Sequence, residues 1–376
     1  MAICRFKFLG GICMSVKKCF AILAAVSVLS FNVACQSKQG NSTTTSEASS
    51  GVTSPASATS SSSSNQAFDP DSEKDKIDYS QLDSKFGTVP KTSGTIKIGA
   101  VEKTLANEYW QLLAKGYKSK GGKLGFSVDV QAAQNENDQA GQLSIAESML
   151  AKNYNALLVS PQTNANLSPA IDKARAAKVP VINVDDALTT DSDVFVGNDQ
   201  KDNGVNAAEY IANKIGKAGQ VACIEGQAGV YATTERTAGF KETIAKYSDI
   251  KMVASVTASW DRQKAMDTAT TIMNQYPELK AFYCNNDDMA LGVVEAVKSA
   301  NKLGKIIVIG TDGISEALKS IKAGELTGTV DSFPEKTGEI SMEIAARMIG
   351  GQKMPRVITT PQALIDKDNM QKYGIN

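Results

Sequence analysis

Short apolar runs alternate with segments of helical periodicity along most of this 376-residue chain. Each run has the length and the continuous apolar character of a buried strand in a parallel sheet. The segments between the runs carry apolar residues at helical spacing, so strands and helices alternate. The pattern runs from Thr95 to about Asp199 and begins again near Val221. We therefore predict an α/β fold with two doubly wound parallel-sheet lobes.

The expected strands are separated by segments that are long enough for a helix. Those of the first unit are residues 95–101, 126–133, 155–161, 179–186 and 194–199, and those of the second are 221–226, 252–260, 281–287 and 305–313. The switch between the units is expected near Gly197–Asp199, with a return crossing near Val330–Pro334.

Residues 1–35 are predicted to be a secretory signal peptide. Lys17 and Lys18 precede an apolar run over residues 20–31, and small residues follow the run. Basic, apolar and small-residue regions in this order are typical of such signals, and the run is too short for an ordinary membrane span. The start of the chain is Met1 or, alternatively, Met14.

Cys35 resembles the lipidated lipobox cysteine of bacterial lipoproteins. Asn32 stands where that motif usually has leucine, so plain cleavage near Ala34 is the alternative to lipidation. Residues 36–66 consist almost wholly of small and polar residues and cannot bury a core. We predict a disordered Ser/Thr-rich tether and adapter over residues 36–93, the last part of which is charged and irregular.

The composition excludes several classes of function. Histidine is absent, which removes the commonest general base and the commonest transition-metal ligand. The 40 basic residues balance the 40 acidic ones, so no general attraction to nucleic acid is expected. No G-x-G-x-x-G turn follows the first strand, which argues against a dinucleotide-dependent enzyme. Cys223 and Cys284 lie in strand-like runs and are expected to be buried free thiols. We expect no metal and no cofactor.

Polar and aromatic side chains cluster where the expected strands end. Because parallel strands of a lobe point the same way, these groups should converge on one edge of each sheet, where ligands bind in α/β proteins. The strand-end groups are Glu102, Lys103, Asn107, Tyr109, Trp110, Asp185, Asp186, Arg236, Trp260, Asp261, Arg262, Asn286, Asp287, Asp288 and Asp312. A polar residue at such a position can instead cap the following helix.

This set of side chains suits a neutral sugar. Carboxylates, amides and a guanidinium provide acceptors and donors for hydroxyl groups. Aromatic rings, here Tyr109, Trp110 and Trp260, suit the C–H faces of a sugar ring, although either tryptophan could instead be a core residue. No acid and base pair at a defined distance is evident, so the pattern favours binding over catalysis.

Five stretches together resemble the ribose-type periplasmic sugar-binding proteins, the solute receptors of ATP-driven sugar importers. The stretches are EKTLANEYW (102–110), VINVDD (181–186), ASWDR (258–262), AFYCNNDDMALG (281–292) and VIGTDG (308–313). The resemblance covers most of residues 95–345 and is greatest to the family members that bind D-allose. It implies the type I periplasmic-binding-protein fold, with lobes of residues 94–197 plus 333–360 and 198–332 plus 361–376. The lobes would be joined by three hinge crossings near Gly197–Asn198, Ser332 and Thr359–Pro361.

The family roles imply sugar contacts at ten positions of this sequence. Tyr109 and Trp110 match the aromatic pair on one sugar face, and Trp260 matches the ring on the other. The full set is Lys103, Asn107, Tyr109, Trp110, Asp185, Arg236, Trp260, Asn286, Asp312 and Ser332. Two positions depart from the family pattern. Glu108 stands where proline is frequent, and Ser332 stands where a hinge glutamine usually touches the sugar.

The resemblance implies a non-enzymatic, monomeric solute-binding lipoprotein on the extracytoplasmic side of a bacterial membrane. It would deliver an allose- or ribose-like monosaccharide to the permease of an ABC importer, and a chemoreceptor is a further possible partner. A receptor for a furanosyl autoinducer or for inositol would share the fold and remains the alternative. A sugar-responsive repressor would need an amino-terminal helix-turn-helix, and the signal-like leader argues against it.

Overall fold

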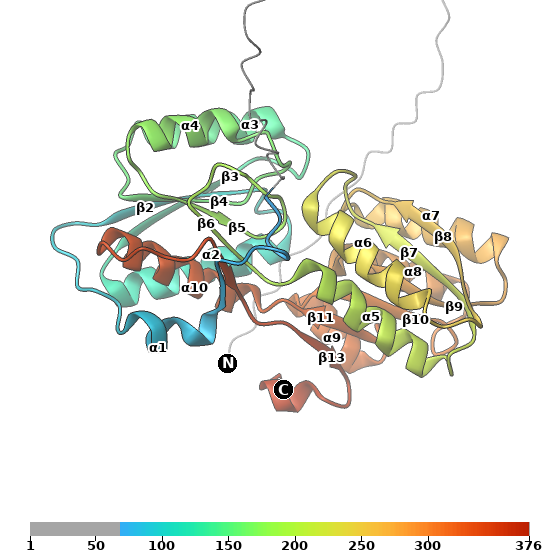
Figure 1. Ribbon diagram of the computed structural model, residues 1–376. Helices are drawn as coiled ribbons and strands as arrows, with labels where there is room; N and C mark the ends of the chain where they lie inside the picture. Colours follow the sequence, from blue (N-terminus) through green and yellow to red (C-terminus); the bar gives the residue numbers. More distant parts are fainter. Residues whose placement is uncertain (1–67, 376) are drawn as a thin grey trace, which may run out of the picture. The chain divides into compact units, whose positions relative to one another are not determined.

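The computed structural model describes residues 68–375, which form two α/β lobes (Figure 1). The predicted signal peptide, Cys35 and the tether up to residue 67 lie outside the described residues. Each lobe is built on one mainly parallel sheet with helices on both faces, so the predicted fold class is confirmed.

The first lobe contains a seven-stranded sheet among the described residues, and all its pairings are parallel. In spatial order the strands are β1 (Lys76–Asp78), β12 (Val357–Thr359), β6 (Val194–Gly197), β5 (Val181–Val184), β4 (Ala156–Val159), β2 (Lys97–Glu102) and β3 (Ser127–Ala132). Every residue of β4, β5 and β6 is buried, which explains their continuous apolar sequences. Figure 1 shows the helices that cover the two faces, α3 (Gln139–Leu150) with α4 (Ser168–Ala176) and α2 (Glu108–Leu124) with α10 (Pro334–Ile349).

The second lobe contains a six-stranded sheet among the described residues. In spatial order the strands are β13 (Ala363–Asp366), β11 (Gly328–Asp331), β10 (Ile307–Asp312), β9 (Leu279–Cys284), β7 (Gly219–Glu225) and β8 (Ile250–Thr257). The helices α5 (Gln200–Lys214) and α6 (Tyr231–Ile244) pack together, as do α7 (Arg262–Gln275), α8 (Asp287–Ser299) and α9 (Ser315–Ala323).

Three segments connect the lobes. The chain passes from β6 to α5 through residues 198–199, from β11 to α10 through 332–333, and from β12 to β13 through 360–362. The last crossing enters the second lobe at the carboxyl edge of its sheet. The next strand, β13, therefore runs back from that edge and pairs antiparallel with β11, whereas the sequence pattern predicted parallel strands alone.

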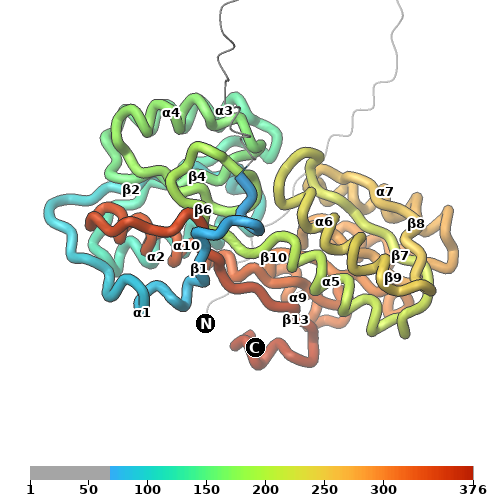
Figure 2. Tube along the Cα trace, viewed as in Figure 1, coloured from blue at the N-terminus to red at the C-terminus, as the bar shows by residue number. Residues whose placement is uncertain are grey.

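The charged segment before Thr95 is not irregular throughout, which corrects the predicted adapter. Within it, β1 pairs with β12, and the blue and red tubes of these strands run side by side in Figure 2. A short helix, α1 (Leu82–Phe86), follows the 3-10 turn Tyr79–Gln81. An edge strand of three residues with one buried side chain, Ile77, leaves too little apolar pattern to be recognised in the sequence.

Cys223 on β7 and Cys284 on β9 are buried free thiols, as predicted. Burial raises the pKa of the Cys223 thiol to about 12, so it stays protonated. Within residues 68–375, no helix is both long and apolar enough to cross a membrane. The same residues contain no cluster of acidic or cysteine side chains suited to a metal ion.

Candidate functional site

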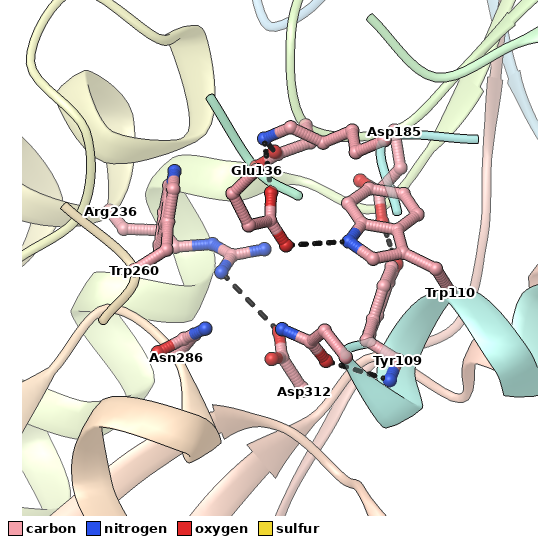
Figure 3. Close-up of a pocket in the computed structure, with 11 residues that line it drawn as sticks. Tyr109, Trp110, Glu136, Asp185, Arg236, Trp260, Asn286 and Asp312 are labelled. Atoms are coloured by element: carbon pink, nitrogen blue, oxygen red, sulfur yellow. Dashed lines mark hydrogen bonds and ion pairs between the residues drawn. The ribbon is translucent and has the colours of Figure 1, made fainter. Parts of the chain in front are cut away.

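Polar and aromatic side chains from both lobes surround one cavity (Figure 3). The cavity lies at the carboxyl ends of strands of both sheets, where ligands bind in open α/β proteins. The lining residues are Lys103, Asn107, Tyr109, Trp110, Glu136, Asp185, Asp186, Arg236, Trp260, Asn286 and Asp312.

All the predicted sugar contacts line this cavity except Ser332. Ser332 is fully buried in the crossing between β11 and α10. Its Oγ has no hydrogen-bond partner among the described residues. The structure therefore brings together the predicted residues from the two sheet edges. Ser332 does not reach the cavity, because its side chain is short and stays within the crossing.

Two asparagines begin helices and also face the cavity. Asn107 precedes α2, and its Oδ1 accepts a hydrogen bond from the Tyr109 N–H at 2.9 Å. Asn286 precedes α8 in the same way, with Oδ1 accepting from the Met289 N–H at 2.9 Å. An asparagine can therefore cap a helix and face the cavity at the same time. Since each Oδ1 is engaged, each residue has its Nδ2 left to donate to a ligand.

Lys103 is the centre of a buried charged cluster on the first lobe. Its ammonium forms an ion pair with Asp186 and lies 3.5 Å from Oε2 of Glu136. The same nitrogen lies 5.6 Å from the ring centre of Trp110 and 5.5 Å from that of Trp260. Glu136 also accepts a hydrogen bond from Nε1 of Trp110 at 3.0 Å (Figure 3). The cluster therefore fixes the orientation of one indole ring and places a cation between two rings.

Asp185 is held by donors on both of its oxygens. It follows β5 directly and has a left-handed backbone, with φ 52°. Gln200 donates from Nε2 to Oδ1 of Asp185 at 2.6 Å, and the Tyr109 hydroxyl donates to Oδ2. Neither donor is charged. The carboxylate is therefore fixed in place by the protein itself.

Arg236 lines the cavity from α6. Its Nε donates to Oε1 of Gln200 at 2.7 Å, and one terminal nitrogen donates to the carbonyl oxygen of Asn285 at 2.6 Å. The same nitrogen lies 3.5 Å from Oδ1 of Asp312. Gln200 therefore links Arg236 to Asp185, because one amide contacts both side chains.

Burial shifts the titration of these charged groups. It raises the pKa of Asp185 and raises that of Asp312 well above its usual value, while the positive charge of Arg236 opposes both shifts. Burial alone lowers the pKa of Lys103, but Asp186 and Glu136 outweigh it and the net pKa is raised. Lys103 therefore stays charged, whereas the buried carboxyl groups are harder to ionise.

The Trp260 ring closes the second-lobe side of the cavity. Its residue has a left-handed backbone, with φ 66°, and its side chain is 6% exposed. The ring packs on Gly226, where a Cβ atom would lie 2.2 Å from it. Only glycine leaves room for the indole at this point. Nε1 of Trp260 has no hydrogen-bond partner among the described residues.

The two aspartates after Asn286 support the site without lining it. Oδ2 of Asp287 accepts hydrogen bonds from the backbone N–H groups of Gly313 and Ile314, at 2.8 and 3.1 Å. Asp287 therefore holds the turn that follows β10. Asp288 lies in the first turn of α8 and forms an ion pair with Arg262 at 2.8 Å.

Three residues important for the site are missing from the predicted contacts. Glu136 follows β3, and the same strand-end rule would have found it in the polar run QNEND after that strand. Asp186 belongs to the strand-end groups but was not among the ten contacts. Gln200 lies in the first turn of α5 rather than at a strand end. No local pattern marks it, because its role depends on contacts with two distant side chains.

The cavity is chemically suited to an uncharged ligand rich in hydroxyl groups. Its two cations, Lys103 and Arg236, each lie beside a carboxyl group of the same wall. Four acidic residues line it against these two cations, which disfavours phosphate or carboxylate ligands. Amide donors, carboxyl acceptors and indole rings remain, and this combination recognises the polar edge and the apolar face of a sugar.

Comparisons with known proteins agree with this chemistry. The profile of the periplasmic binding protein domain family matches residues 98–353. The D-allose-binding periplasmic protein of Escherichia coli K12 is 38% identical over 70% of this chain and 86% of its own length. The ribose import binding protein RbsB of Bacillus subtilis 168 is 35% identical over 73% of this chain and 90% of its own.

Comparison with a solved structure also points to a sugar-binding protein of a transport system. The chain is similar to an ABC transporter periplasmic solute-binding protein from Actinobacillus succinogenes 130z with bound D-allose. The TM-score is 0.70 at 32% identity, and the match covers 74% of this chain and 100% of that one. The relatives described here are binding proteins of transport systems and not enzymes.

Proposed function

Because the chain belongs to the periplasmic binding protein family, we propose that it is the solute-binding protein of an ABC sugar importer. Its ligand is a neutral monosaccharide related to allose or ribose. One observation carries this proposal most directly. Hydrogen-bonding groups from both lobes and two indole rings surround a single cavity.

Ligand-driven closure of the lobes is the mechanism that the contacts support. The Ala232 N–H on α6 donates to the Asp186 carbonyl oxygen of the other lobe at 2.9 Å. Nδ2 of Asn164 donates to the carbonyl oxygen of Gly229 at 3.3 Å, again between lobes. A sugar that touches both lobes binds the closed arrangement better than an open one, and it shifts the population by that difference in affinity.

The amino-terminal segments suit a tethered receptor. Lipidation at Cys35 would attach the protein to the outer side of the bacterial membrane, and the Ser/Thr-rich tether would keep it close to its permease. The closed form is the state that the permease recognises, and a chemoreceptor is a second candidate reader of it. Globomycin treatment of expressing cells should leave a larger precursor that retains its leader, and Cys35→Ser should leave a larger precursor that carries no lipid. If the mature mass carried no lipid, cleavage without lipidation would replace this part of the proposal.

A thermal-shift screen tests the ligand class. Purified protein without its leader is melted with D-allose, D-ribose, D-galactose, D-psicose and myo-inositol at millimolar concentration. A ligand that binds only the native state at 100 times its Kd adds about 2.7 kcal/mol to the free energy of unfolding. We expect the largest rise in Tm with allose or ribose. No rise with any sugar would overturn the proposal.

Two variants locate the binding event. Arg236→Ala and Asp185→Ala remove groups that line the cavity and should abolish the rise in Tm. Lys123→Ala is the matched control, because Lys123 forms an exposed ion pair with Glu339 far from the cavity lining. If both cavity variants kept full affinity, the ligand would bind elsewhere. A response to myo-inositol alone would favour the alternative of a polyol receptor.

A further inference from the structure

Tyr109 supplies a hydroxyl group to the cavity wall at the point where a ligand hydroxyl would be expected. The Asn107 cap fixes the start of α2 and so the position of Tyr109, whose side chain is 4% exposed. Its ring meets Trp110 edge to face, with centres 4.8 Å apart. The Tyr109 hydroxyl donates to Oδ2 of Asp185, and both residues line the cavity (Figure 3).

The carboxylate of Asp185 is partly occupied before any ligand binds. An ionised carboxylate has about four acceptor sites. Gln200 takes one on Oδ1, and Tyr109 takes one on Oδ2. Gln200 is itself held by Arg236, so its amide cannot turn away without losing that hydrogen bond. Asp185 can therefore accept from fewer ligand hydroxyls than a free carboxylate could.

We propose that the Tyr109 hydroxyl takes the place of one ligand hydroxyl at Asp185, so that the protein binds monosaccharides with and without that hydroxyl group about equally well. The inference rests on the proposed sugar-binding function. A sugar that lacks the hydroxyl at this point loses little, because Tyr109 already satisfies the carboxylate. A sugar that carries it gains little, because the Tyr109 hydroxyl already occupies that acceptor site on Oδ2.

The chemistry of the pair keeps this arrangement over the physiological pH range. Burial, together with the negative charge of Asp185, raises the pKa of Tyr109 well above 10. The phenol therefore remains a donor. Phenylalanine at the same position would keep the ring but leave Oδ2 of a buried carboxyl group without its donor, and a ligand hydroxyl would then be needed there.

Tyr109→Phe tests the inference by titration calorimetry. The probes are D-allose or D-ribose, whichever binds the wild-type protein more tightly, and the monodeoxy derivatives of that sugar. We expect one deoxy derivative to bind the wild type within about threefold of its parent. The same derivative should bind Tyr109→Phe at least about tenfold more weakly than the parent, since a hydrogen bond to a charged group is lost.

Tyr283→Phe is the matched control. Tyr283 is a fully buried tyrosine on β9 whose hydroxyl lies 3.1 Å from Oγ1 of Thr311, and it does not line the cavity. Its deoxy profile should equal that of the wild type. Identical profiles in Tyr109→Phe and the wild type would overturn the inference but leave the proposed function standing.

Two further outcomes would overturn the inference about Tyr109. If removal of each sugar hydroxyl weakened binding to the wild type tenfold or more, the inference would fail without any variant, so it does not depend on the folding of Tyr109→Phe. If the wild type bound no sugar at all, the proposed function would fail, and this inference with it.

Discussion

Oε2 of Glu108 accepts a hydrogen bond from the backbone N–H of Glu316 at 3.2 Å. Glu108 is the first residue of α2 on the first lobe, and Glu316 lies in the first turn of α9 on the second. The residue before α9, Ile314, provides no side-chain cap. A carboxylate from one lobe thus satisfies a free N–H at the positive end of a helix in the other.

This contact predicts that Glu108 stabilises the closed arrangement. Glu108→Ala should weaken sugar binding about fivefold, because a helix cap contributes about 1 kcal/mol. Glu108→Gln keeps an acceptor and should lose less. Calorimetric titration measures both affinities, and thermal melting without sugar separates closure from general stability. Equal affinity of Glu108→Ala and the wild type would show that the contact does not favour closure.

The close packing of the Trp260 ring on Gly226 allows a steric test of the role of Trp260. Gly226→Ala places a methyl group where a Cβ atom lies 2.2 Å from the indole, so the ring must move. We expect a loss of sugar binding and a destabilisation of about 1–3 kcal/mol. Tryptophan fluorescence and urea unfolding report the two effects. Gly122→Ala on α2, with no atom within 4 Å of its added methyl group, is the control. Unchanged binding by Gly226→Ala would mean that Trp260 is not a ligand contact.

The contacts of Arg347 predict that the amino-terminal adapter contributes to the stability of the first lobe. Its buried guanidinium donates to Asp83 at 2.6 Å, to Glu343 at 2.8 Å and to the carbonyl oxygen of Gly87 at 2.8 Å. Arg347→Ala should lower the free energy of unfolding by about 1–3 kcal/mol, because the Gly87 carbonyl and the partly buried Glu343 carboxylate lose their donor. Urea unfolding measures the loss. Lys173→Ala, which breaks an exposed ion pair with Glu147, should change it by less than about 1 kcal/mol. An equal effect of both would contradict the prediction.

Glu102 predicts a dependence of stability on pH. This fully buried carboxyl group lies near Tyr117 and Ser160, and burial raises its pKa to about 8. The folded state therefore holds a proton that the unfolded state releases near pH 4. The resulting stability is complete below pH 4 and is lost as the pH rises toward 8. Between pH 5 and 8 the loss should be on the order of a few kcal/mol.

Glu102→Gln checks this dependence, because glutamine is neutral at every pH. Urea unfolding at pH 5 and pH 8 should show a smaller difference for the variant than for the wild type. Glu147→Gln, at an exposed position, should behave like the wild type. Parallel pH profiles of Glu102→Gln and the wild type would show that Glu102 is ionised in the folded protein.

Much of the fold follows from local sequence. Strands such as Val181–Val184 are continuous apolar runs because both faces of a parallel strand are covered. This pattern can be recognised from the sequence alone. The position of the site follows too, since the carboxyl ends of parallel strands share one edge. Asp185 and Asn286 were found in this way. Strand β1, with one buried residue, and the antiparallel strand β13 were not, because their pairing depends on where distant segments cross.

The sequence by itself determined the alternation of strands and helices, the residue types at the strand ends and hence the class of ligand. Only the tertiary structure decided which side chains satisfy one another. It placed Gln200 between Asp185 and Arg236, and it directed the Tyr109 hydroxyl at Asp185. The physical reason is that periodicity is a local property of the chain. A hydrogen bond instead requires a distance and an angle, and these exist only once distant elements have packed together.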